Sequence, residues 1–419
     1  MFRDYNVLII NPECPIPPDD GHKLRNYHIL RHFLKGYRFN LITGGKNELT
    51  NNDKIYLSKL GPCFKNITYV QKNNLKSLEL KSKYERIKNI FSPHELSLGK
   101  SFYSDEYSKI VSKEIRSTKY DLIYYCGYSS FIYDPSRQHN TPRIVDIVDS
   151  MSLYMKNEYI KENSIKNKIK SYINYIWAKN YEKKYYSKAK NIIMITKKDA
   201  SYVKNNCPNS KVWVVQNGVD TEYFRKSEII TQSGNVLIFT GVMDYSPNSE
   251  AAIHLIREIL PIIKKNVYDI NVLIVGKNPT EELKRIAKKD KCVTITGYVE
   301  DLRPYFNKAK IYVAPILSGA GMKNKILEAW SMSLPVVATK TACDGIDIED
   351  GENVIIANDE KKFANDVIRL INDSKMREIL SYNGRARAEE RYSWKSMSCY
   401  LENVFLEVLQ SNSVRNQIS

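Results

Sequence analysis

From residue 235 onward, short runs of β-branched and other apolar residues alternate with amphipathic stretches of helical period. Strands that are apolar on both faces are typical of parallel sheets, in which the stretches between strands form crossover helices. The first half of the chain shows the same alternation less regularly. The pattern therefore predicts an α/β protein with two doubly wound parallel sheets in tandem. The expected strands are 5–10, 39–43, 120–126, 143–148, 191–196 and 211–216, then 235–241, 270–276, 292–297, 311–315, 334–339 and 353–357.

The polar segment 217–235 contains an Asn-Gly turn and suits a linker between two domains. We therefore expect an N-terminal domain over 1–225, completed by a C-terminal helix at about 396–419, and a C-terminal domain over 226–395. The expected helices are 22–35, 75–90, 104–117, 155–189, 248–265, 280–289, 300–309, 322–333 and a last stretch from Tyr392 to about Leu409.

Charge and cysteine content narrow the class of protein. The 64 Lys and Arg against 47 Asp and Glu give a formal charge of +17, which favours an anionic partner such as nucleic acid, anionic lipid or a phosphorylated substrate. Seven scattered cysteines without a C-x-x-C pair argue against a disulfide framework and a zinc ribbon. No apolar run reaches the roughly 18 residues that span a bilayer. The expected protein is globular and cytoplasmic.

The loop after the first expected strand is rich in proline and passes through Gly21 into a helix. Glycine permits close approach of the backbone, and the N–H groups of a helix start suit a phosphate or a sugar. A plain turn explains Gly21 equally well, so both interpretations stay open.

The segment 315–339 carries a stronger pattern. Small residues at 318–321 precede a helix that has Lys323 and Lys325 in its first turn and Glu328 one turn later. Backbone donors, the positive end of a helix and flexible cations are what a diphosphate needs, while Glu328 could accept hydrogen bonds from a ribose diol. A solvated lysine-rich surface and an ordinary exposed helix acid are the alternatives.

Three other nucleotide or metal motifs are absent. After Gly319 and Gly321 the third position of a G-x-G-x-x-G dinucleotide motif is Asn324, which argues against a Rossmann dehydrogenase. No P-loop pattern occurs. No two aspartates stand two residues apart, so a D-x-D metal clamp is missing and a metal-free mechanism is favoured.

The chain resembles the retaining glycosyltransferases of family 4, of the bacterial polysaccharide-biosynthesis type. The matching pieces are QNGVDTEYF (216–224), FTGVMDYSPNSEA (239–251), GYVEDLRPYFNKAKIYVAP (297–315) and GAGMKNKILEAWSMSLPVVAT (319–339), with PPDDGHKLR similar to the opening glycine loop. The resemblance is dense from about 190 to 395 and thin from 45 to 140. It implies the GT-B fold, with two Rossmann-like domains and a cleft between them.

The resemblance also implies roles in donor binding. Glu328 would hold the ribose, Lys323 and Lys325 would bind the diphosphate and act in catalysis, and the loop at Tyr298 would lie against the base. The family's E-x7-E pair would begin at 320, where this chain has Ala320, so backbone amides of 320–322 would meet the sugar. The usual Arg and Lys after strand 235–241 are also missing. The expected donor-binding residues are Gly21, Gly241, Tyr298, Val299, Ala320, Gly321, Met322, Lys323, Lys325 and Glu328.

On the acceptor side, many members have a histidine directly after the strand that corresponds to 143–148. This chain has Val148 there, followed by Asp149. We expect Asp149 to orient a reacting hydroxyl, with a structural loop acid as the alternative. His22 and Asp146 complete the expected acceptor-side residues.

A basic and aromatic segment occupies the middle of the chain. Residues 156–190 hold ten Lys against three Glu, and residues 65–118 hold eleven basic against six acidic side chains. Tyrosines lie between the lysines of the first stretch. Anionic lipid, nucleic acid and a merely solvated lysine face each fit this composition.

The expected function is transfer of a sugar from a nucleoside-diphosphate sugar to a glycan or polyprenyl-linked acceptor with retention of configuration. No cofactor and no metal are expected, nucleic acid is not an expected partner, and peripheral association with the inner face of the cytoplasmic membrane is a further expectation. A sugar-nucleotide epimerase of the same fold and a basic nucleic-acid-binding protein are the alternatives.

Overall fold

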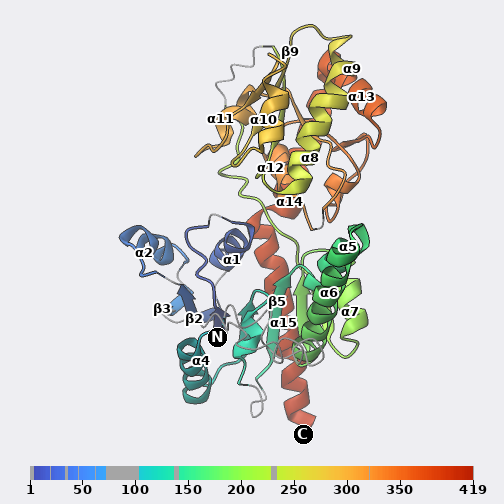
Figure 1. Cartoon of the computed structure of the whole chain (residues 1–419). Coiled ribbons are helices and arrows are strands. Elements are labelled where there is room, and N and C mark those ends of the chain that lie inside the picture. Colours follow the sequence, from blue (N-terminus) through green and yellow to red (C-terminus); the bar gives the residue numbers. More distant parts are fainter. Residues whose placement is uncertain are drawn as a thin grey trace. The chain divides into compact units, whose positions relative to one another are not determined.

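The computed structural model describes residues 4–18, 20–33, 36–45, 47–61, 63–71, 103–135, 141–227, 234–319 and 321–418 (Figure 1). The chain forms two compact units. Unit 1 comprises Met1–Gln216 and Met397–Ser419, and unit 2 comprises Asn217–Ser396. The sequence placed the first boundary at 225/226 instead. The expected linker begins inside unit 2 because Arg385 donates hydrogen bonds to the carbonyls of Thr221 (3.0 Å) and Phe224 (2.8 Å).

Unit 1 is built on a seven-stranded parallel sheet in the order β3-β2-β1-β4-β5-β6-β7. The edge strand β3 was not predicted, because FKNITYVQ keeps several polar side chains exposed and never forms an apolar run. The strands are β1 Tyr5–Asn11, β2 Tyr37–Gly45, β3 Phe64–Gln71, β4 Leu122–Cys126, β5 Arg143–Val148, β6 Asn191–Met194 and β7 Lys211–Val214.

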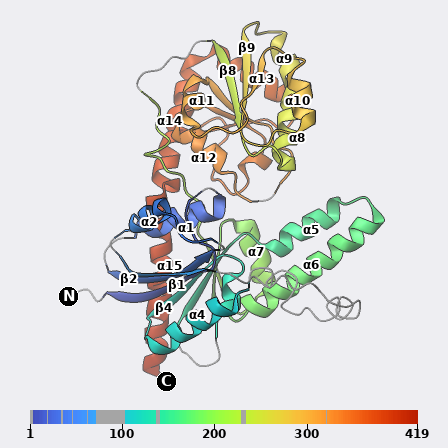
Figure 2. The same cartoon turned by 60° about the vertical axis from the view of Figure 1, so that its left-hand side comes forward.

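Helices surround this sheet. The helix expected over 155–189 is two helices, α5 and α6, which lie side by side and project from the sheet as a hairpin (Figure 2). The helix expected over 75–90 lies outside the described residues. The helices of unit 1 are α1 Gly21–Arg31, α2 Asn51–Ser58, α4 Asp105–Ser117, α5 Met151–Lys161, α6 Ile165–Tyr186 and α7 Lys197–Asn206, with a 3-10 turn at Ser130–Tyr133; α15, Trp394–Ile418, begins in unit 2 and supplies the last segment of unit 1.

Unit 2 is built on a six-stranded parallel sheet in the order β10-β9-β8-β11-β12-β13. The strands are β8 Asn235–Thr240, β9 Ile270–Val275, β10 Val293–Ile295, β11 Ile311–Ala314, β12 Val336–Ala338 and β13 Ile355–Ile356. The helices are α8 Ser246–His254, α9 Leu260–Lys264, α10 Glu281–Ala287, α11 Arg303–Lys308, α12 Asn324–Ser331, α13 Glu360–Asn372 and α14 Ser374–Tyr392, with a 3-10 turn at Thr341–Cys343.

The helix expected over 248–265 is interrupted by a π turn at Leu255–Ile259, between α8 and α9. Pro261 has no N–H for the helical ladder, and a wider turn before it accommodates the missing bond. Otherwise the expected elements of unit 2 recur with slightly shorter bounds. The structure confirms the predicted α/β class with two doubly wound domains.

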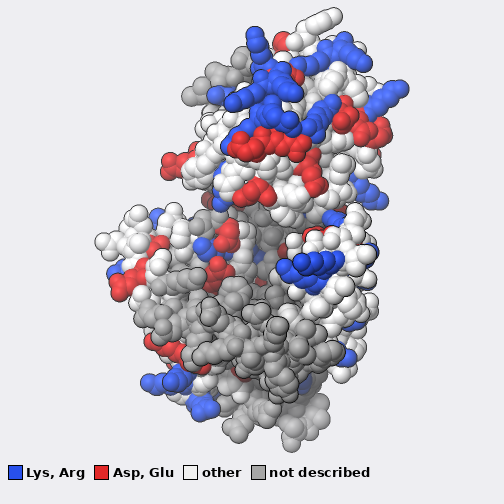
Figure 3. Space-filling model, in the orientation of Figure 1, with Lys and Arg blue, Asp and Glu red and all other residues white. Residues whose placement is uncertain are grey.

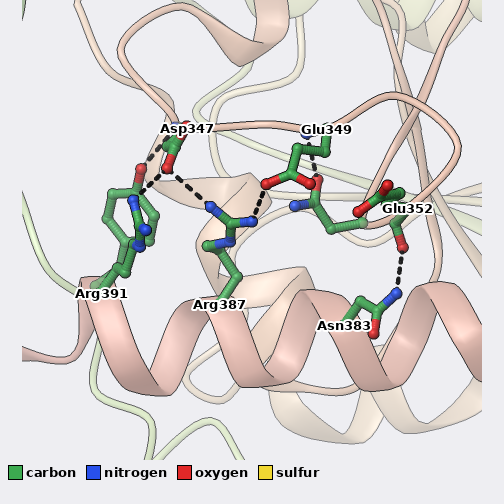
Figure 4. Close-up of polar contacts among 8 residues, drawn as sticks. Asp347, Glu349, Glu352, Asn383, Arg387 and Arg391 are labelled. Atoms are coloured by element: carbon green, nitrogen blue, oxygen red, sulfur yellow. Dashed lines mark hydrogen bonds and ion pairs between the residues drawn. The ribbon is translucent and has the colours of Figure 1, made fainter.

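Helix α14 holds α12 in place. A Cβ on Gly384 would lie 2.5 Å from Cδ1 of Trp330, so glycine allows α14 to approach this fully buried residue of α12. Figure 4 shows that α14 also binds the loop after β12: Arg387 pairs with Asp347 at 2.8 Å and with Glu349, and Arg391 pairs with Asp347 at 2.6 Å. Helix α14 therefore packs closely against α12 and is itself tied by ion pairs to the loop at 347–349.

Both sheets reverse their strand order at one point, between β1 and β4 in unit 1 and between β8 and β11 in unit 2. In open α/β sheets, ligands bind outside the carboxyl ends of the strands at such a switch point. The fold therefore marks one candidate position in each unit.

Candidate active site

In unit 2, the candidate position is occupied by a lysine that reaches the end of β8. Lys325 Nζ donates a hydrogen bond to Asn248 Oδ1 at 2.6 Å, and Asn248 Nδ2 donates to the carbonyl of Val242 at 2.9 Å. A Cβ on Gly241 would lie only 3.1 Å from Lys325 Nζ. Glycine at 241 thus leaves room for the ammonium group at the switch point.

Lys325 and Glu328 lie three residues apart on α12 and so share one face of the helix. Burial lowers the pKa of Lys325 to about 8, and the nearby Glu328 opposes that shift. Burial raises the pKa of Glu328 to about 7, opposed by Lys325. Such perturbed pKa values gather at functional sites, because desolvated charges interact strongly with an arriving ligand.

Lys323 is the residue before α12 and is only 8% exposed. Its ammonium group donates to the carbonyl of Gly321 at 3.0 Å, and within the described residues no side chain caps this helix start. The Ile326 N–H donates to the carbonyl of Lys323 at 3.1 Å, so the N–H groups before it in the first turn are the ones that an anion could bind. Met322 is buried and Gly321 has φ of 75°, whereas Ala320 lies outside the described residues.

The loop after β10 carries Tyr298 and Val299. Tyr298 is 75% exposed, and Val299 is half-buried. An exposed aromatic ring at the carboxyl end of a strand is suited to stack on a planar base. This contact stays a prediction.

In unit 1, a pocket of about 690 Å³ opens at the carboxyl ends of the strands on both sides of the switch point. Its walls come mainly from the loops after β1, β2 and β4 and from the end of β5, with further side chains from the starts of α1, α2 and α5 and from β3. The lining residues are Pro12, Glu13, Cys14, Ile16, Pro17, His22, Lys23, Gly44, Gly45, Asn47, Glu48, Leu49, Asp53, Tyr69, Cys126, Gly127, Tyr128, Ser129, Ile147 and Met151.

His22 lines this pocket from α1. Its Nε2 lies 3.3 Å from Asn26 Nδ2, and its Nδ1 lies 3.7 Å from Glu13 Oε2. A Cβ on Gly127 would lie 2.6 Å from His22 Nε2, so the glycine after β4 makes space for the imidazole. Apart from its chain neighbours, no atom of the described residues lies within 4 Å of a Cβ built on Gly21, and the expected role of Gly21 near a diphosphate stays a prediction.

Asp146 was expected to contact the acceptor, but it is not among the residues that line the pocket. The residue is 1% exposed and accepts hydrogen bonds from Arg25 at 2.9 Å and from Tyr124 at 2.7 Å. Arg25 also donates to the carbonyls of Val215 and Gln216. The carboxylate of Asp146 is therefore a buried support that joins β5, β4 and α1.

Asp149, by contrast, is exposed beside the pocket, since Ile147 and Met151 on either side of it line the wall. Its N–H donates to the carbonyl of Ile147 at 3.1 Å, closing a three-residue turn in which Val148 has φ of 73°. This conformation is strained for a β-branched residue. Such strain is typical of functional sites, where the surroundings hold the backbone in place.

The sequence did not predict the two buried carboxylates, Glu182 and Asp199, that accept hydrogen bonds from the residues after this turn. Buried Glu182 of α6 accepts hydrogen bonds from Ser150 Oγ and Ser152 N, both at 3.0 Å, and from Ser152 Oγ, while Asp199 accepts one from Ser150 N at 3.1 Å. Burial raises the pKa of Glu182, and the hydrogen bonds oppose the shift. One glutamate in a lysine-rich helix gave no signal of this role. Asn248 lies in the segment 239–251, but its contact with Lys325 could likewise not be predicted from the sequence.

All seven cysteines are free thiols. Nowhere in the described ranges do three His, Cys, Asp or Glu side chains come together as ligands of a metal would. Nor is any helix in this part of the chain long and apolar enough to cross a bilayer.

Comparison with known proteins adds to this geometry. Residues 234–373 match the family model of glycosyl transferases group 1. The chain is 26% identical over 412 residues to an uncharacterized 44.6 kDa protein in the cps region of Klebsiella pneumoniae, covering 95% of this chain and 99% of that protein. It is 26% identical over 171 residues to the capsular polysaccharide biosynthesis glycosyltransferase CapM of Staphylococcus aureus, covering 38% of this chain and 44% of CapM.

Among solved structures, Anabaena HepE in complex with UDP and glucose is similar in fold, with a TM-score of 0.62 at 14% identity over 96% of this chain and 100% of HepE. The family match lies in unit 2, where Lys325 contacts Asn248 beside Gly241 and Glu328 follows on the same helix. The matched domain, the relatives and the two parallel-sheet units together support a glycosyltransferase of the GT-B fold.

Proposed function

We propose that this protein is a retaining glycosyltransferase that moves a sugar from a nucleoside-diphosphate sugar to a glycan or polyprenyl-linked acceptor. The observation that carries the proposal is the contact of Lys325 with Asn248 beside Gly241, with Glu328 on the same helix face. A cation beside an uncapped helix start, with a carboxylate one turn away, is what a diphosphate and a ribose diol require. HepE was solved with UDP and with UDP-glucose, so UDP is the first nucleotide to test.

The unit 2 residues would act mainly on the leaving group. As the bond between the sugar carbon and the diphosphate oxygen breaks, negative charge grows on the diphosphate, and preorganised cations stabilise it. Lys325 and Lys323 supply that charge together with the N-terminus of α12. An anion next to Lys325 would raise its pKa above the value of about 8, which keeps the ammonium charged while the donor is bound. We therefore propose a mechanism that needs no divalent metal.

The unit 1 pocket would receive the acceptor. Asp149 beside it would orient the attacking hydroxyl, and His22 would form part of the wall. In a retaining transfer the hydroxyl approaches from the face that the diphosphate leaves. Its proton can then pass to the departing phosphate oxygen as the new bond forms. Retention rests on the resemblance to family 4 described above.

A soluble nucleotide sugar and a polyprenyl-linked acceptor meet at the cytoplasmic surface of a membrane. We therefore propose a cytoplasmic protein that works at the inner face of the cytoplasmic membrane. The basic segment 156–190 supports this location, because that leaflet is negatively charged.

A thermal-shift screen of nucleoside diphosphates and nucleotide sugars tests the proposal, because a ligand of the native state raises the melting temperature. We expect one nucleoside diphosphate and its sugar conjugate to stabilise the protein. Turnover of that conjugate should require an acceptor, persist in excess EDTA and give a product with the donor's anomeric configuration by NMR. Conversion of the donor without any acceptor would indicate an epimerase instead. Stabilisation by no nucleotide would overturn the proposal.

A further inference from the structure

The hairpin of α5 and α6 carries large apolar side chains that stay exposed in the part of unit 1 that the structure describes. Ile165, the first residue of α6, is 80% exposed, and Ile169 is 59% exposed. With Tyr172 they follow the spacing i, i+4, i+7, so they form one stripe along α6. Ile160, near the end of α5, is also exposed. Isoleucine is among the residues most often buried, so a stripe of this kind marks a surface that contacts something apolar.

Exposed lysines flank the stripe. At about 100° per residue, Lys168 lies on one side of Ile165, and Lys166 and Lys170 lie on the other. Figure 3 shows basic side chains gathered over this part of unit 1, above α5 and α6. Of the acids near the tip, Glu162 accepts a hydrogen bond from the N–H of Ser164 at 2.9 Å, and Glu158 lies one turn back on α5.

The base of the hairpin differs from its tip. Ala178, Tyr181, Glu182 and Tyr186 of α6 are buried, and the last two anchor the helix through hydrogen bonds to Ser152 and to the carbonyl of Tyr128. The tip of the hairpin, residues 158–172, therefore projects from a base that is anchored at residues 178–186 (Figure 2). A rigid support lets the tip present its stripe without a cost in ordering.

We propose that the hairpin tip docks on an anionic lipid surface, with Ile165 and Ile169 at the boundary between headgroups and acyl chains. The lysines on both sides would then lie at the level of the lipid phosphates, as in helices that lie in the membrane interface. A lipid surface supplies both the apolar layer and the negative charge that this pattern needs. The inference deepens the membrane location proposed above and rests on the proposed function only in that respect.

Vesicle sedimentation tests the docking surface. The full-length protein is mixed at low salt with vesicles of phosphatidylcholine alone or of phosphatidylcholine with phosphatidylglycerol. We expect sedimentation with the anionic vesicles only, and release as ionic strength rises. Each lysine near such a surface contributes about fivefold in partitioning, so the triple variant Lys166→Gln, Lys168→Gln, Lys170→Gln should lose about a hundredfold.

The matched control removes the same charge from the base of the hairpin, with Lys183→Gln, Lys184→Gln and Lys188→Gln, all of them exposed. We expect this variant to keep most of the binding. The variant Ile165→Ser, Ile169→Ser keeps every charge but should also lose binding at least tenfold, because the apolar insertion is gone. Unchanged melting temperatures would show that the exposed substitutions leave the fold intact.

Equal loss in the base and tip lysine variants, or full binding by the isoleucine variant, would overturn the inference in favour of diffuse charge attraction. No sedimentation with either vesicle would overturn it in favour of a protein partner. Nucleotide binding, measured on the same samples, separates the two proposals. A protein that binds vesicles but no nucleotide contradicts the proposed function alone, and one that binds nucleotide but no vesicles contradicts the docking surface alone.

Discussion

The two candidate half-sites are built in different ways. The half-site of unit 2 is concentrated in the loop and first turns of α12, where Lys323, Lys325 and Glu328 lie within six residues. The pocket of unit 1 is assembled mainly from the loops after β1, β2 and β4 and from the end of β5, so its walls come from widely separated parts of the chain. The same doubly wound fold thus carries a local motif in one unit and a composite pocket in the other. If the proposed roles hold, a charged and chemically uniform ligand is recognised by a short motif, whereas a variable acceptor is bound by loops.

The largest effect should come from the local half-site. Replacing Lys323 and Lys325 together by glutamine removes the cations that stabilise the leaving diphosphate, so we expect kcat to fall by about 10²–10³-fold. The dissociation constant of the donor should change less, because the charge on the diphosphate grows during bond breaking. Steady-state kinetics with donor calorimetry measures both. The exposed Lys375→Gln on α14 is the control and should behave as the parent protein. A loss confined to donor affinity would contradict the leaving-group role.

In the composite half-site, Asp149→Asn keeps the shape but removes the charge beside the pocket. We expect turnover to fall about 10–100-fold, the value of one charge-assisted hydrogen bond. Donor affinity should stay unchanged, because Asp149 lies beside the pocket that we propose for the acceptor. Glu106→Gln, an exposed acid of α4 in the same unit, serves as the control. Weaker donor binding by the asparagine variant would contradict the separation of donor and acceptor between the two half-sites.

Donor affinity should depend on pH through the two groups of α12. Below its pKa of about 7, Glu328 gains a proton and loses the charge that accepts the ribose hydroxyls. Above its pKa of about 8, Lys325 loses the charge that binds the diphosphate. Binding should therefore be strongest between about pH 7 and 8 and weaken about tenfold one unit below that window.

A nucleotide sugar is the right probe for this profile, because its diphosphate has no free terminal phosphate that titrates near pH 6. Lys325→Arg keeps the cation charged and should remove the alkaline limb while leaving the acidic limb. An affinity that is flat from pH 6 to 9 would show that neither group contacts the donor.

The smallest effect should come from the support beneath Asp149. Glu182→Gln removes the buried carboxylate that accepts from Ser150 and Ser152, so the free energy of unfolding should fall by about 1–3 kcal/mol. We expect turnover to fall a few-fold with the KM for the donor unchanged. Chemical denaturation and kinetics on the same samples separate these effects. Lower stability with full turnover would show that the support does not position the turn at Val148.

The sequence predicted the fold well wherever a strand is a continuous apolar run, as in β8, β9 and β11. It failed where structure depends on distant partners. The edge strand β3 has no apolar run, and the long helix expected over 155–189 ends at Lys161 and restarts at Ile165 without a glycine or proline as a signal. Such breaks are set by tertiary packing rather than by local propensity.

The candidate site follows the same rule. The common helix face of Lys325 and Glu328 could be predicted from their spacing, because residues three apart share a face, whereas their contact with a donor stays a prediction. Asp146 could not be placed correctly, since its partner Arg25 lies 121 residues away in sequence. The pocket walls formed by Gly127, after β4, and by Tyr69 of β3 gave no signal either, because only the folded sheet brings these segments together.

Titration calorimetry of the donor measures whether the unit 2 half-site binds a nucleoside diphosphate. The nucleotide selected by thermal shift is titrated into the parent protein, into Glu328→Gln and into Glu378→Gln, an exposed acid of α14. We expect tight binding to the parent protein and the control, and about 10–100-fold weaker binding to Glu328→Gln through loss of the charged contact to the ribose. Equal affinity in all three proteins would contradict it.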